Sequence, residues 1–138
     1  MVVISSRAKY IEEFRIVVDD GRDHSVCLDL PPDTGTNMGP TALELGVMSF
    51  SGCVATIFTL MAKKMRVPIS DLEVKVKAEK PEDACTVTMA DCEIIVKTGG
   101  SEEKIDRVWN KTRKNCPVGV LFEQAGVKVD YKLKIVKE

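Results

Sequence analysis

Thiols are the side chains of this sequence whose type and placement are most suggestive of chemistry. Five cysteines occur among 138 residues, an odd number at irregular spacing: Cys27, Cys53, Cys85, Cys92 and Cys116. This pattern does not resemble a structural disulfide framework. No Cys-x-x-Cys pair and only one histidine accompany it, so we do not expect a zinc site. Free structural thiols and redox-active thiols remain as the two interpretations.

Cys53 closes the segment GPTALELGVMSFSGC, which reads as the start of a helix and places Gly52 beside the thiol. A glycine inside a helix costs about 1 kcal/mol relative to alanine, so it usually has a packing or close-approach reason. Either another helix crosses at this point or a small molecule must reach the sulfur. Composition alone favours the crossing helix.

Cys116 precedes Pro117 at the end of a predicted helix. Proline removes a backbone donor and prevents the helix from continuing smoothly, which leaves backbone polar groups available near the sulfur. A buried thiol at a helix end is the simplest interpretation, and haem-ligand and sulfur-carrier sites are the alternatives for a Cys-Pro pair. The other three cysteines lie on or near predicted strands, and we interpret them as structural: Cys27, Cys85 and Cys92.

The elements that must position these thiols are predicted from hydrophobic periodicity and turn residues. The ranges 9–18 and 24–30 predict two strands of a hairpin around an Asp-Gly turn, and Pro31 and Pro32 end the second strand. Further strands are predicted over 72–80, 85–99 and 127–136, the second with a bulge near Ala90 and Asp91. Ser101 caps a predicted amphipathic helix over 101–115, which is followed by a short turn.

The longest predicted helix runs from Thr41 to about Arg66, with apolar residues three or four positions apart. Thr41 and Glu44 form a capping-box pattern at its start. The helix is apolar nearly all round and should be buried, and its serines, threonines and glycines favour a core helix over a membrane span. Since few other elements are available to cover it, we expect a symmetric homodimer.

The order of these elements predicts an α+β fold with largely antiparallel sheet, built as a single domain over residues 1–138. The net charge of −1 and the aromatic content of 5% give no sign of nucleic-acid or membrane-surface binding. The first fourteen residues, MVVISSRAKYIEEF, carry charges before any long apolar run and do not resemble a signal peptide. We therefore expect a cytoplasmic protein.

The segment from Gly39 to Cys53 resembles the helix signature G-P-x-x-x-E-L-x-x-x-x-x-x-G-C of the OsmC/Ohr family, the osmotically induced and organic hydroperoxide resistance proteins. The segment CPVGVLFEQAGVKVDYKL is similar to the second-cysteine region of that family. The resemblance covers nearly the whole chain. It implies an OsmC-like fold, with antiparallel sheets around a long buried central helix and two subunits intertwined around paired helices.

The resemblance also implies a thiol-dependent peroxidase in oxidative or osmotic stress defence. Cys53 matches the cysteine that attacks the hydroperoxide, and Cys116 matches the resolving cysteine. The thiolate is the nucleophile, the product is a sulfenic acid, and the second thiol converts it to a disulfide. An external dithiol or lipoyl reductant then restores the thiols, so neither a metal nor an organic cofactor is required.

One position departs from the pattern of many active members. They carry a glutamate where this chain has Leu43, one place before Glu44, and that glutamate holds an arginine against the reactive cysteine. Glu44 resembles a more divergent branch, with helix capping and catalysis as its open roles. Arg22 is the candidate arginine, and Arg7 and Arg15 remain open.

Two other functions are compatible with these residues. The dimer cleft of an OsmC-like protein could hold a small apolar or thiol-reactive ligand without turnover, because fold alone does not decide activity. A sulfur-transfer carrier using Cys116 and Pro117 is the third possibility.

Overall fold

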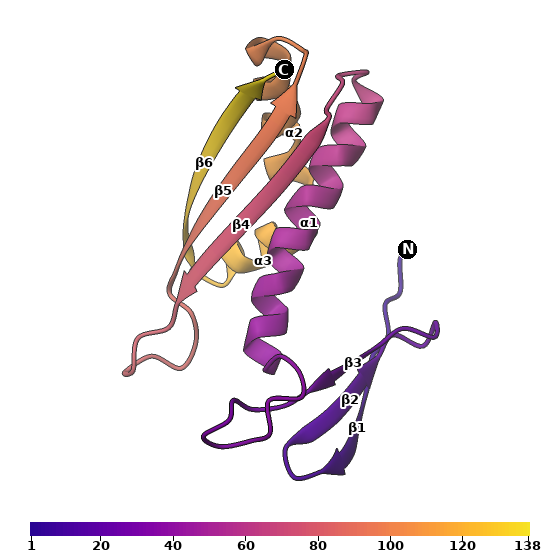
Figure 1. Ribbon diagram of the computed structural model, residues 1–138, viewed down its shortest axis with the longest axis vertical. Coiled ribbons are helices and arrows are strands. Elements are labelled where there is room, and N and C mark those ends of the chain that lie inside the picture. Colours follow the sequence, from indigo (N-terminus) through magenta and orange to yellow (C-terminus); the bar gives the residue numbers. More distant parts are fainter. The chain divides into compact units, whose positions relative to one another are not determined.

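The computed structural model describes all 138 residues, and the chain divides into two compact units, Met1–Gly46 and Val47–Glu138. Each unit contains its own three-stranded sheet. Helix α1, Ala42–Lys64, begins in the first unit and continues in the second (Figure 1). The predicted helix is therefore confirmed to within two residues at its C-terminal end.

The first unit contains the strands β1, β2 and β3, which run antiparallel in that order: Arg7–Glu12, Arg15–Asp19 and Ser25–Leu28. The predicted Asp-Gly hairpin is confirmed, since Asp19 lies opposite Ser25 and Gly21 has a φ of 75°. The prediction of one continuous strand over 9–18 is wrong. The chain reverses after Glu13, which has a φ of 52°, a conformation that side chains other than glycine rarely adopt.

A buried carboxylate, that of Asp29, organises the loop that follows β3. It accepts hydrogen bonds from the backbone N–H groups of Leu30 and Met38 and, at 2.5 Å, from the hydroxyl of Thr36. These bonds turn the chain away, so β3 ends at Leu28 rather than at the predicted Leu30. The hydrogen bond from Thr36 is the main reason that the pKa of Asp29 falls from 3.8 to about 2.

This carboxylate should make stability depend on pH in the acid range. Because its pKa is lower in the folded state, its contribution is complete above pH 3.8 and is lost as the pH falls through about 2. We expect Asp29→Asn to be less stable than the wild type at pH 7, with a difference that shrinks between pH 4 and pH 2. Urea unfolding followed by circular dichroism measures this, with exposed Asp33→Asn as the control. A difference between Asp29→Asn and wild type that stays constant with pH would contradict it.

The start of α1 shows the predicted capping box. The Thr41 N–H donates to Glu44 Oε1 at 2.8 Å, and the Glu44 N–H donates to Thr41 Oγ1 at 3.0 Å. Two backbone donors that the helix leaves unsatisfied are thereby paired. Glu44 thus has a structural role at the helix terminus.

The second unit places three helices on one face of the sheet β4-β5-β6 (Figure 1). Its further elements are β4 (Asp71–Glu79), β5 (Met89–Thr98), α2 (Glu102–Asn115), α3 (Pro117–Gln124) and β6 (Lys128–Lys137). The core that these elements share includes Phe50, Phe58, Ile94, Val96, Ile105 and Val108. Strands β4 and β5 are antiparallel, whereas β5 and β6 are parallel. The α+β fold is confirmed, and three of the four strand pairs are antiparallel.

Two details of the second unit differ from the predictions. Strand β5 begins at Met89 rather than at Cys85, because its partner β4 ends at Glu79, just before Pro81. The register of β4 with β5 continues without a shift through Ala90, so the predicted bulge is wrong. The predicted helix cap is confirmed, since Ser101 Oγ accepts a hydrogen bond from a backbone N–H of α2.

Helix α1 is only partly buried within the single chain. Phe50, Val54 and Phe58 are buried, whereas Met48 is 53% exposed and Leu60 43% exposed. The helix is long and apolar enough to cross a membrane, a criterion that core helices of soluble proteins also meet. The homodimer stays a prediction.

Candidate redox site

Cys53 and Cys116, 63 positions apart in the sequence, are in contact in the second unit. The thiol of Cys116 donates a hydrogen bond to Cys53 Sγ, with the two sulfurs 3.1 Å apart. Cys53 lies in the middle of α1 and is partly buried, and Cys116 lies between α2 and α3 and is 2% exposed. Both cysteines are reduced in this structure.

The backbone at Cys116 explains how its sulfur reaches this place. Cys116 ends α2 and is also the N-cap of α3, with Pro117 at the first helical position. Proline is well suited to that position, because the N–H that it lacks would be unpaired there. As an N-cap, the Cys116 sulfur accepts the N–H of Gly119 at 3.4 Å. The short turn predicted after Pro117 is therefore the start of a helix.

The thiol of Cys116 is held in its neutral form. Burial raises its pKa to about 12, and its hydrogen bond to Cys53 acts in the same direction, whereas the Gly119 N–H lowers it. A neutral thiol is a donor, and the sulfur that faces it acts as acceptor. In the reduced pair, Cys116 is therefore the donor and Cys53 the acceptor.

Aromatic side chains line the core next to Gly119. The ring of Phe50, one turn before Cys53 on α1, lies 4.7 Å from that of Phe122 and 6.5 Å from that of Tyr131, measured between centroids. The Tyr131 hydroxyl donates to Glu123 at 3.0 Å, and burial raises the pKa of this hydroxyl. Phe50 is completely buried, so its ring has little room to shift within the packed core.

The other cysteines lie in three different environments. Cys92 on β5 is buried in the core, and burial raises the pKa of its thiol to about 11. Cys27 on β3 is partly buried, and Cys85 is exposed in the loop between β4 and β5. None of the three forms a disulfide, and their interpretation as structural thiols stays a prediction.

The predicted arginine and glutamate have partners of their own in the first unit. Arg22 lies in the turn after β2, is 78% exposed at its side chain and pairs with Asp20 at 3.7 Å. Arg15, an alternative candidate for this arginine, donates to Glu12 at 2.7 Å. Glu44 is engaged in the capping box. Catalytic roles for Arg22 and Glu44 stay predictions.

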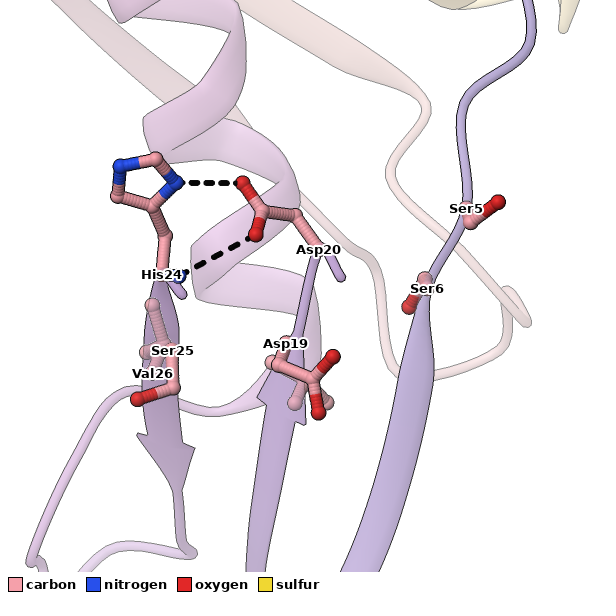
Figure 2. A pocket seen from close by; sticks show the side chains of 8 residues that line it. Ser5, Ser6, Asp19, Asp20, His24, Ser25 and Val26 are labelled. Carbon is pink, nitrogen blue, oxygen red and sulfur yellow. Dashed lines mark hydrogen bonds and ion pairs between the residues drawn. The ribbon is translucent and has the colours of Figure 1, made fainter. Parts of the chain in front are cut away.

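A hollow of about 320 Å³ in the first unit contains a histidine–carboxylate pair (Figure 2). His24 Nδ1 lies 2.8 Å from Asp20 Oδ2, a pairing found in many hydrolases. Figure 2 shows the other ring nitrogen pointing away from the neighbouring serines, Ser5, Ser6 and Ser25. These serines are therefore not placed for activation by His24. No cluster of potential ligands suited to a metal ion occurs in the chain.

Sequence reasoning missed Gly119, the residue whose N–H contacts the buried sulfur. The signal was present in the Cys-Pro pair, because proline is favoured at the first position of a helix and the residue before it is then the N-cap. From the sequence alone, that proline is interpreted as the residue that stops the preceding helix, whereas in the structure it also begins α3. The contact itself depends on three-dimensional packing.

Comparisons with known proteins agree with this fold. The family model described as OsmC-like protein matches residues 35–132. An OsmC-like protein from Mycoplasma pneumoniae has a TM-score of 0.87 at 16% identity, covering 98% of both chains. The organic hydroperoxide resistance protein OhrB of Bacillus subtilis has a TM-score of 0.63 at 20% identity, covering 97% of this chain and 98% of that chain. No curated protein matches in sequence.

A third solved structure is, like the Bacillus subtilis protein, described as an organic hydroperoxide resistance protein. It is an organic hydroperoxide resistance protein from Elizabethkingia anophelis, with a TM-score of 0.72 at 15% identity, covering 100% of this chain and 98% of that chain. At such identities the structures show the shared fold, and the family model, which spans more than half of the chain, shows the family. The chain belongs to the OsmC/Ohr family.

Proposed function

We propose that this protein is a thiol-dependent peroxidase that reduces organic hydroperoxides with Cys53 and Cys116. The observation that carries the proposal is the 3.1 Å contact between their sulfurs. The family is generally hydroperoxide-reducing, and solved structures with this fold are described as organic hydroperoxide resistance proteins. Cys53 is the more accessible sulfur of the pair, which suits the residue that meets the peroxide.

In the first step the Cys53 thiolate attacks one oxygen of the hydroperoxide. A sulfur–oxygen bond forms, the O–O bond breaks, and the leaving alkoxide takes up a proton to become an alcohol. The product is Cys53 sulfenic acid.

In the second step Cys116 attacks the sulfur of that sulfenic acid. The S–S bond forms, the S–O and S–H bonds break, and water leaves. A disulfide has sulfurs about 2.05 Å apart, so a pair already 3.1 Å apart needs only a small approach. Two thiol–disulfide exchanges with an external dithiol or lipoyl group then return both thiols.

We also propose the domain extent, the cellular location, the homodimer and the assisting residues. The chain would act as one OsmC-like domain over residues 1–138, without a bound cofactor, in the reducing cytoplasm. The exposed apolar side chains of α1, including Met48 and Leu60, support a homodimer in which they are covered. Glu44 and Arg22 are proposed as groups that assist Cys53.

Peptide mapping after one equivalent of cumene hydroperoxide tests the proposal. The expected result is one alcohol released per chain and a disulfide between Cys53 and Cys116. A protein that only binds a small ligand in the dimer cleft would give neither product. A sulfur carrier would instead accumulate a persulfide on Cys116, which is difficult to present to a partner at 2% exposure.

A further inference from the structure

Gly119 occupies a position where even one added carbon would touch the redox pair. A Cβ at this residue would lie 3.3 Å from Cys116 Sγ and 3.4 Å from Phe50 Cε1. By contrast, a Cβ at Gly52, also in a helix of this unit, would meet nothing within 4 Å. The absence of a side chain at Gly119 therefore matters for the cysteine pair.

The two neighbours that a Cβ at Gly119 would meet, the Phe50 ring and the Cys116 sulfur, differ in how easily they can move. Phe50 is completely buried and packs against Phe122 at 4.7 Å, so its ring is held by the core. The Cys116 sulfur is the end of a short side chain that can rotate about one bond. A group added at Gly119 would therefore displace the sulfur rather than the ring.

We propose that Gly119 is a positioning residue for disulfide formation, acting through Cys116 by holding its sulfur against Cys53. The inference rests on the peroxidase function proposed above and deepens it, because it assigns Gly119 to the second step alone. The attack of Cys53 on the hydroperoxide does not require Cys116 to move. It should therefore proceed at its normal rate when the Cys116 sulfur is displaced.

The N–H of Gly119 adds an electrostatic part to this role. In the second step Cys116 must lose its proton as its sulfur bonds to Cys53. Burial raises the pKa of Cys116, and the Gly119 N–H at 3.4 Å acts in the opposite direction. The first turn of a helix favours negative charge, so the α3 N-terminus stabilises the sulfur as it deprotonates.

The test is a single-turnover reaction of the reduced protein with one equivalent of cumene hydroperoxide. Samples are quenched over time, and alcohol release, dimedone-trapped Cys53 sulfenic acid and the disulfide are measured separately. For Gly119→Ala we expect alcohol release at the wild-type rate and disulfide formation slowed about tenfold. The added Cβ requires the sulfur to shift by a few tenths of an ångström, and a misplacement of about 1 Å can cost about a hundredfold. The dimedone adduct should increase accordingly.

Two further variants make the result specific. Leu121→Ala, on the same helix at a side chain that is 64% exposed, should behave as wild type. Phe50→Leu combined with Gly119→Ala removes the Phe50 Cε1 contact and should restore part of the disulfide rate, although it lowers stability. If Gly119→Ala acted only by lowering stability, the double variant should form the disulfide more slowly than Gly119→Ala, because it is the less stable protein.

The outcomes separate the two proposals. If the wild type releases no alcohol, the peroxidase function is wrong and the role of Gly119 falls with it. If the wild type forms the disulfide but Gly119→Ala forms it equally fast, only the role of Gly119 is wrong. A variant that slows both steps to the same extent would also overturn the assignment, since it would show a general effect on the site.

Discussion

Cys53→Ser should abolish the turnover of organic hydroperoxides. A serine hydroxyl is not ionised near neutral pH and is a poor nucleophile toward peroxide oxygen, so the first bond cannot form. Removing an essential nucleophile lowers turnover by several orders of magnitude, and we expect at least about a thousandfold. The measurement is the loss of cumene hydroperoxide in the presence of a dithiol, at equal concentrations of folded protein.

Comparison with Cys116→Ser distinguishes the two cysteines. This variant should release one alcohol per chain and then stop as Cys53 sulfenic acid, which excess peroxide oxidises further. Cys85→Ser, at the exposed cysteine outside the site, is the matched control and should remain active. The assignment is contradicted if Cys53→Ser keeps its activity, or if Cys116→Ser prevents the first alcohol from being released.

The elements that the sequence predicts well are those whose signals are local. The periodicity of α1 and the capping residues Thr41 and Glu44 identify that helix, and the reciprocal hydrogen bonds confirm its start. The helix α2 is similarly marked by Ser101 at its N-cap. Each of these signals depends on residues only a few positions apart.

The elements that were missed depend on unusual local geometry or on distant partners. The turn after β1 places Glu13 at positive φ without a glycine or asparagine to indicate it. The parallel pairing of β5 with β6 requires a long crossover, which α2 and α3 together supply. No pattern within either strand specifies the direction of its neighbour.

Some features of the candidate site could likewise be predicted from the sequence, and others could not. The types and sequence contexts of Cys53 and Cys116 made them candidates, and the family resemblance supplied their expected roles. Spacing could not show that sulfurs 63 positions apart lie in contact, because tertiary packing determines that distance. Gly119 could be recognised only when the atoms around its missing side chain were known.

Phe50→Ala should produce the largest loss of stability. The ring is completely buried on α1 and contacts Phe122 on α3 and Tyr131 on β6, so it joins three elements of the core. Its removal loses the transfer free energy of the ring and leaves a cavity that packed neighbours fill only partly. We expect the free energy of unfolding to fall by about 3–5 kcal/mol.

Urea unfolding of the reduced protein at one fixed concentration measures this loss, because the stability of the proposed homodimer would depend on protein concentration. Leu121→Ala removes an exposed apolar side chain from α3 and should change the free energy of unfolding by less than about 0.5 kcal/mol. A loss at Phe50 no larger than this control would mean that the ring is not a core residue in solution. Phe50 is also a neighbour of Gly119. That result would therefore mean that the Phe50 ring is not the fixed contact that the proposed role of Gly119 requires.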